Sequence, residues 1–148
     1  MDYLELALIA FAAVVLVYVS ITDIRERRIP NHIMFPALGI ALAVALARPE
    51  RWSLLLGGLI AGTLFLIPIL THGLGKAGGG DMKLGLFIGL VLGWPSIFLA
   101  LLIAFVSALL FVIVGVTLRR VKLRSVIAFG PFLAFGGIVT GALSLITL

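Results

Sequence analysis

Long hydrophobic runs separated by short polar breaks make up almost the whole sequence. About 20 apolar residues are needed to cross a membrane as a helix, because the hydrocarbon core is about 30 Å thick and a helix rises about 1.5 Å per residue. The segment 84–118 carries no charge, but as one straight helix it would measure about 52 Å, so the segment 93–96, with its Trp and Pro, is expected to divide it. The pattern predicts six helices over residues 4–21, 32–47, 54–70, 78–92, 96–118 and 126–148.

The composition indicates a single membrane-embedded domain over residues 1–148. Hydrophobic residues make up 63% of the chain and charged residues 11%, whereas a soluble domain is usually about half apolar and a quarter charged. Such a chain cannot cover itself with polar surface, so a soluble fold is excluded. The first residues are acidic and lead into an apolar run too long for a signal peptide, so this run is interpreted as a permanent span. We expect an all-α polytopic membrane protein.

The positive charges predict the orientation of the helices. All but two of the 11 lysines and arginines fall in the first, third and fifth predicted loops: Arg25, Arg27, Arg28, Lys76, Lys83, Arg119, Arg120, Lys122 and Arg124. The other two, Arg48 and Arg51, fall in the second loop. By the positive-inside rule, the first, third and fifth loops are cytoplasmic and both termini lie outside. This distribution is typical of a multi-pass protein of the plasma (inner) membrane, in contact with lipid and not with nucleic acid.

The fourth predicted helix is short. Its apolar part, residues 84–92, cannot cross a membrane, so the helix is expected to begin near Gly78. Asp81 and Lys83 would then lie in or just below the interface, where an ionisable residue is costly and is a candidate for function. Glycines recur at four-residue spacing in this helix and in two others, which predicts close helix packing: Gly85, Gly89 and Gly93, Gly58 and Gly62, and Gly137 and Gly141.

Two aspartates are candidates for catalysis. Asp23 follows the first apolar run and Asp81 begins the fourth helix, so both are expected at the cytoplasmic face. If they meet, their carboxyl groups share a site of low dielectric constant in which both cannot easily ionise. The ionised member of such a dyad can take a proton from water while the protonated member polarises a peptide carbonyl. The alternative is structural: each Asp caps a helix or pairs with a nearby cation, as Glu26 is expected to do between Arg25 and Arg27.

Other polar groups restrict the chemistry further. The chain has no Cys, which excludes disulfides, thiolate metal sites and a cysteine nucleophile. The two histidines, His32 and His72, lack the spacing of a zinc site and are interpreted as interface residues, so no metal and no cofactor is expected. No serine stands in a Gly-x-Ser-x-Gly context. The residues before Asp81 lack a Cβ and would let an extended substrate lie against the helix end; they are Gly78, Gly79 and Gly80.

Three segments resemble the type IV prepilin peptidases. Residues 23–31, DIRERRIPN, are similar to the first active-site segment of that family, an Asp followed by a basic stretch and Ile-Pro-Asn. Residues 78–84, GGGDMKL, are similar to its second, the GxGD motif followed by x-Lys-Leu. Residues 129–137, FGPFLAFGG, are similar to its Phe-Gly-Pro-Phe-Leu-Ala segment. The three occur in the family's order over essentially the whole chain, which makes the resemblance specific.

The resemblance implies a membrane aspartic endopeptidase. Such enzymes cut the basic leader of type IV prepilins, pseudopilins or archaeal flagellins on the cytoplasmic side after a Gly. Asp23 and Asp81 match the two catalytic aspartates of the family, and Gly78 and Gly80 match the motif glycines. No metal takes part in this chemistry.

Three residues beside the aspartates are expected to contact the substrate or position the site: Lys83, Pro30 and Asn31. Larger family members carry an additional N-terminal region with Cys-x-x-Cys pairs, which is associated with N-methylation of the mature pilin. The absence of Cys implies a short, peptidase-only form without this methyltransferase region, similar in size to the Flp/Tad-type prepilin peptidases.

Three alternatives remain open. Presenilin-type GxGD proteases are longer and place their aspartates deep within helices, whereas Asp23 lies at the end of a span beside arginines. A small membrane transporter or channel would use Asp23 and Asp81 as proton or cation sites, although the sequence shows no internal repeat of the kind such folds usually have. A structural subunit of a pilus assembly would tolerate Asn at both positions.

Overall fold

Helices form all the regular structure in the part of the chain that the computed structural model describes, residues 3–26, 31–49, 51–72, 79–119 and 130–147. Within these residues there are six, which confirms the predicted all-α class. They are α1 (Tyr3–Glu26), α2 (Asn31–Ala47), α3 (Arg51–His72), α4 (Gly79–Leu92), α5 (Ser96–Thr117) and α6 (Gly130–Thr147).

The apolar runs predict the helices well, and the differences fall at their polar ends. α1 continues past the run that ends at residue 21 and carries Asp23 within its last turn. α4 begins at Gly79, one residue after the predicted start, Gly78, which lies outside the described residues. α6 is described from Gly130, so its predicted first residues, 126–129, also lie outside the described residues. Hydropathy marks the membrane-compatible part of each helix, and polar residues can extend a helix beyond it.

The predicted division of the long uncharged segment is confirmed. α4 ends at Leu92 and α5 begins at Ser96, after a turn that contains Pro95. The start of α3 holds this turn through hydrogen bonds: the Trp94 amide donates to the Ser53 carbonyl oxygen over 3.0 Å, and the Ser53 hydroxyl donates to the Trp94 carbonyl oxygen over 2.6 Å. These bonds satisfy backbone groups that would otherwise lie unpaired beside apolar helices.

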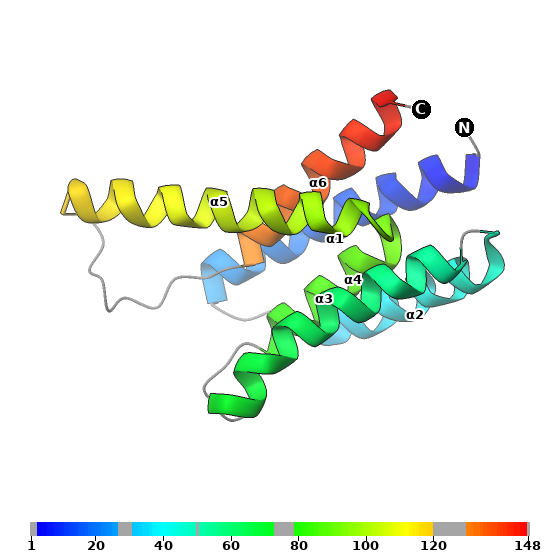
Figure 1. Ribbon diagram of the computed structural model, residues 1–148, viewed down its shortest axis with the longest axis horizontal. Helices are drawn as coiled ribbons and strands as arrows, with labels where there is room; N and C mark the ends of the chain where they lie inside the picture. The colour runs from blue at the N-terminus through cyan, green and yellow to red at the C-terminus, as the bar shows by residue number, and fades with distance from the viewer. Residues whose placement is uncertain (1–2, 27–30, 50, 73–78, 120–129, 148) are drawn as a thin grey trace.

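The helices alternate in direction along the long axis of the molecule. Figure 1 shows the C-terminal ends of α1, α3 and α5 and the N-terminal ends of α2, α4 and α6 toward one end, on the left. The N-terminal end of α1 and the C-terminal end of α6 lie toward the other end. The last turn of α1, with Asp23, and the first turn of α4, with Asp81, therefore lie toward the same end of the bundle, where α6 also begins.

α4 is the central helix of the bundle. It contacts each of the other described helices, and most of its residues from Leu84 to Val91 are buried. Its 14 residues rise only about 21 Å, less than the thickness of the hydrocarbon core. The neighbouring helices surround it, so a short helix at this place exposes little polar backbone to lipid.

Glycine lets α4 approach α3 at backbone distance. A Cβ on Gly57 would lie 2.7 Å from the Gly93 Cα and would also meet the Gly89 carbonyl oxygen. The predicted stripe of Gly85, Gly89 and Gly93 thus packs on α3. Its middle residue, Gly89, lies against both Gly57 and Gly58. Small residues at such crossings gain dispersion contacts that larger side chains would prevent.

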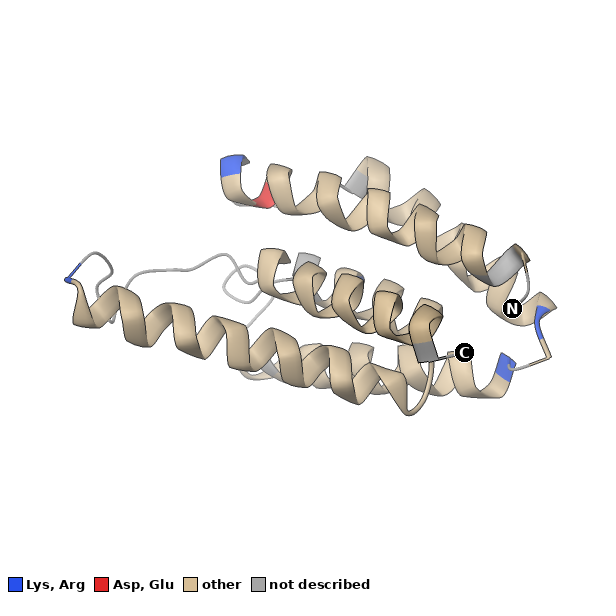
Figure 2. Cartoon of the chain, turned by 90° about the horizontal axis from the view of Figure 1, so that it is seen from above, with Lys and Arg blue, Asp and Glu red and all other residues tan. Residues whose placement is uncertain are grey.

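The outer surface of the bundle is apolar. α5 exposes large hydrophobic side chains along its length: Phe98, Leu99, Leu102, Phe105, Val106, Leu109, Leu110, Phe111, Ile113 and Val114. Figure 2 shows the coloured charges at the two ends of the molecule, with a long uncharged middle between them. Exposed apolar surface of this extent is typical of a protein that contacts lipid.

Two helices among the described residues are long and apolar enough to cross a membrane: Leu6–Arg25 and Ser96–Thr117. The remaining helices contain shorter apolar stretches: His32–Ala47, Arg51–Ile67, Met82–Leu92 and Gly130–Ile146.

Candidate active site

Asp23 is buried because it continues the inner face of α1. The residues on this face recur at spacings of three and four, and all of them are buried: Leu8, Ala12, Val15 and Val19. Asp23 stands four residues after Val19 and is only 6% exposed. A carboxyl group at this place is costly unless it has a hydrogen-bond partner.

The partner of Asp23 is the first residue of α6. The Gly130 amide donates a hydrogen bond to Asp23 Oδ2 over 3.1 Å, and the two residues are 107 positions apart in the sequence. The first amides of a helix lack acceptors within the helix, and the N-terminal end of a helix dipole is positive, so an Asp oxygen is well suited to this place. The contact joins the first motif of the sequence, 23–31, to the third, 129–137.

The second motif enters the structure at the first turn of α4. Gly79, Gly80 and Asp81 are the first three residues of this helix. α4 contacts both α1 and α6, and its N-terminal end lies toward the end of the bundle where α1 ends and α6 begins (Figure 1). The side chain of Asp81 lies outside the described residues, so the dyad of Asp23 and Asp81 stays a prediction.

Lys83 follows within the same turn of α4. Its Nζ lies 4.5 Å from the centroid of the Phe35 ring, on α2. An ammonium group at this distance is attracted by the ring's quadrupole, so the pair fixes the start of α4 against the start of α2. Asn31 is the first residue of α2, with its side chain outside the described residues, as are Pro30 and Gly78.

The described residues contain no group of three or more His, Asp or Glu side chains that could hold a metal ion. His32 is exposed near the start of α2, and the side chain of His72 lies outside the described residues.

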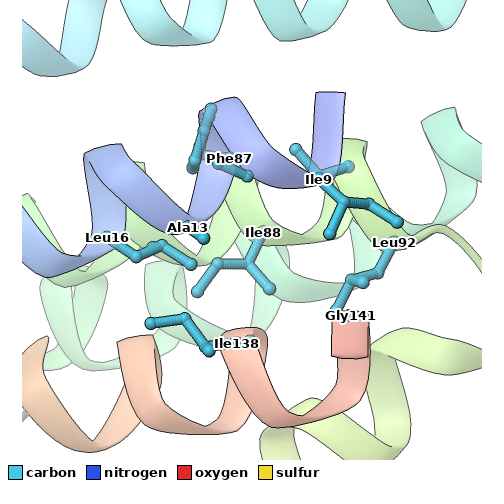
Figure 3. A pocket seen from close by; sticks show the side chains of 11 residues that line it. Ile9, Ala13, Leu16, Phe87, Ile88, Leu92, Ile138 and Gly141 are labelled. Carbon is cyan, nitrogen blue, oxygen red and sulfur yellow. The ribbon is translucent and has the colours of Figure 1, made fainter. Parts of the chain in front are cut away.

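A small cavity lies inside the bundle between α1, α4 and α6. Figure 3 shows Ile88 of α4 between Leu16 of α1 and Ile138 of α6, with Ile9 and Leu92 farther along. Its volume is about 30 Å³ and its lining is apolar. A space of this size holds at most about one water, and an apolar one stays dry. The cavity is therefore not a candidate for the reaction site.

Sequence reasoning finds Asp23 but misses its partner. Gly130 belongs to a motif that resembles a known family, yet the resemblance gives no role to this glycine. The available signal was the position of the motif at the start of the last helix, because unpaired amides there can hold a carboxylate.

Comparison with known proteins finds similarity over most of the chain. A family model described as the type IV leader peptidase family matches residues 10–113. A prepilin leader peptidase/N-methyltransferase of Bacillus subtilis (strain 168) is 36% identical over 127 residues, which cover 84% of this chain and 50% of the relative. A protein of the same description from Burkholderia pseudomallei (strain 1026b) is 33% identical over 146 residues, which cover 90% of this chain and 46% of the relative. The chain spans about half the length of these relatives. No solved structure matches.

Proposed function

This chain belongs to the type IV leader peptidase family, and on that premise we propose that it is a membrane aspartic endopeptidase. Its substrate is a type IV prepilin or pilin-like protein, whose basic leader peptide it removes at the cytoplasmic face. Asp23 and Asp81 are the catalytic residues, and neither a metal nor a cofactor takes part. The methyl transfer in the relatives' names is not extended to this chain, which has no Cys.

One observation carries the proposal. The carboxyl group of Asp23 is buried, and the first amide of α6 holds it through a hydrogen bond. The N-terminal end of α4 lies toward the same end of the bundle. Asp81 belongs to the first turn of that helix. Burial with one fixed hydrogen bond keeps a carboxyl group in a defined orientation, which general acid–base catalysis requires.

The reaction proceeds by addition of one water molecule across the scissile peptide bond. The ionised Asp takes a proton from water, and the water oxygen attacks the carbonyl carbon. The protonated Asp gives its proton to the carbonyl oxygen as the tetrahedral intermediate forms. Collapse of the intermediate breaks the C–N bond, the leaving amine receives a proton from the first Asp, and the second recovers its own proton. The dyad thus ends the cycle as it began it.

The membrane arrangement follows the charge pattern. The chain crosses the plasma membrane six times with both termini outside, and the ends of α1 and α5 that carry Arg25 and Arg119 face the cytoplasm. The shorter helices cross by tilting or by thinning of the bilayer near them, at modest cost per ångström. A basic leader that emerges from the inner leaflet then meets the aspartates at the correct side.

Residues around the dyad hold the substrate. Gly78, Gly79 and Gly80 give an extended peptide access to the start of α4, because their backbone carries no Cβ. Pro30 and Asn31 follow Asp23 in the sequence and position the site, and Lys83 fixes α4 on α2 through Phe35.

The experiment is peptide cleavage by the purified chain in liposomes. Synthetic peptides with a basic leader, a Gly and the start of an apolar helix are incubated with it, and the products are identified by mass spectrometry. A single cut after the Gly supports the proposal. No cut in any leader peptide, together with proton or cation flux into the same liposomes, would instead support the transporter alternative.

A further inference from the structure

We infer that Gly130 is a positioning residue for Asp23, and that this position must lack a side chain for the reaction to proceed. The inference deepens the proposed function and rests on it for its catalytic part. Two observations carry it: the hydrogen bond from the Gly130 amide and the space that the Asp23 carboxyl group occupies beside it.

The amide of Gly130 fixes one oxygen of the carboxyl group. It donates to Asp23 Oδ2 over 3.1 Å, within the ordinary range for an amide and a carboxylate. With Oδ2 held, rotation of the carboxyl group about its last bond is restricted. The proposed reaction then needs only Oδ1 to face the water.

The carboxyl group fills the space where a side chain on residue 130 would begin. A Cβ at Gly130 would overlap Asp23 Oδ2 and lie 3.1 Å from Asp23 Cγ. Alanine therefore cannot be added there while the carboxyl group keeps its place.

The Gly130→Ala substitution should move the Asp23 carboxyl group and leave α6 in place. α6 is held in place by α5 at backbone distance, because a Cβ on Gly136 would meet the Ala100 carbonyl oxygen. Leu133 and Ala134, one turn after Gly130, are fully buried. The end of a short side chain can rotate, whereas a packed helix cannot shift without opening the core.

The first test separates kcat from KM. The Gly130→Ala variant should retain its KM for a leader peptide and lose kcat on the order of 100-fold, because a misplacement of about 1 Å has that effect on a catalytic group. A change in KM with an unchanged kcat, or no change in either constant, overturns the inference.

Two other glycines provide matched controls. A Cβ on Gly39 would meet nothing within 4 Å, so Gly39→Ala should leave both constants unchanged. A Cβ on Gly58 would lie 2.9 Å from the Leu90 side chain, so Gly58→Ala creates an overlap of the same kind elsewhere. If Gly58→Ala lowers kcat as much as Gly130→Ala does, the loss reflects general strain, and the inference is wrong.

The second test needs no peptidase activity. In an Asp23→Ala background the overlapping oxygen is absent, so adding Gly130→Ala should not lower the melting temperature further. The same substitution in the wild-type chain should lower it. If the Gly130→Ala single variant is too unstable to accumulate in cells, accumulation of the Asp23→Ala/Gly130→Ala double variant supports the contact between residues 23 and 130. If the double variant does not accumulate either, the contact is wrong. If the wild-type chain cuts no leader peptide, the proposed function fails, and this thermal cycle still decides the contact.

Discussion

Replacing Asp23 by Asn and by Ala separates its hydrogen bond to α6 from its acid–base chemistry. Asn keeps an oxygen that can accept from the Gly130 amide, but it cannot exchange a proton with water. Ala removes both functions and leaves a buried amide without this acceptor. The two variants therefore have different expected stabilities and the same expected activity.

The magnitudes follow from the contact. Loss of a capping oxygen at a helix N-terminus costs about 0.5–2 kcal/mol, and a buried amide left unsatisfied costs about 1–3 kcal/mol. These figures describe the same bond and are not added, so Asp23→Ala should lose about 1–3 kcal/mol of stability. Asp23→Asn should lose less than about 1 kcal/mol, the usual worth of a charge beside a helix dipole. Both should lose cleavage by a factor on the order of 10²–10⁴, the usual contribution of a positioned acid or base.

The assay combines thermal unfolding in detergent with cleavage of a leader peptide in liposomes. Glu26→Gln is the control, because it removes a carboxylate from the same turn of α1 and should retain cleavage. The reasoning is refuted if Asp23→Asn cuts at more than a tenth of the wild-type rate. It is also refuted if Asp23→Ala is as stable as Asp23→Asn, since the bond to Gly130 would then contribute nothing.

Three further substitutions test the packing. Gly57→Ala should lower the melting temperature clearly more than Gly39→Ala, because its Cβ would meet the backbone of α4; equal effects in thermal unfolding would contradict the close approach of α3 and α4. Thr140→Val should raise stability by about 1 kcal/mol, because the Thr140 hydroxyl is buried and has no hydrogen-bond partner among the described residues; a loss of stability would mean that the hydroxyl is satisfied. Phe35→Leu should lower the free energy of unfolding by about 0.5–1 kcal/mol in the wild-type chain and leave it unchanged in a Lys83→Met background. An equal loss in both backgrounds would exclude the cation–π contact.

The helices could be predicted from the sequence because each apolar run is long and each break is polar. The turn at residues 93–95 followed from Trp and Pro within an uncharged segment, and the structure confirms it. The alternation of basic and non-basic loops also predicted which helix ends lie together, as Figure 1 shows for the described helices.

The neighbours of each helix could not be predicted. A soluble helix reveals its buried face by alternating polar and apolar residues, but a helix in lipid is apolar on all sides. Nothing in the hydropathy of α4 distinguishes it as the central helix or distinguishes α5 as an outer one. The glycines gave a partial signal: Gly89 was recognised by its spacing, whereas Gly57 and Gly136 were not, although both lie against a neighbouring backbone.

The candidate site was predictable only in part. Asp23 stood out because it is the first carboxylate after an apolar run, and its burial follows from the spacing of the inner face of α1. Its bond to Gly130 depends on the packing of the first helix against the last, which no local pattern contains. The position of the Asp81 side chain relative to Asp23 depends on how α4 packs against α1, and it stays a prediction.

The convergence of Asp23 and Asp81 is tested most directly by cross-linking of cysteines. Because the chain has no Cys, the double variant Asp23→Cys/Asp81→Cys carries only the two thiols under test. The Asp23→Cys/Gly130→Cys pair is the positive control, because a Cβ on residue 130 would lie 3.5 Å from the Asp23 Cβ, close enough for a disulfide. The Asp23→Cys/Ser53→Cys pair, at opposite ends of the bundle, is the negative control. Oxidation in membranes should cross-link residues 23 and 81 within one chain. If only the positive control is cross-linked, both by the oxidant and by a short bifunctional thiol reagent, the two aspartates do not share a water and the proposed catalytic dyad is wrong.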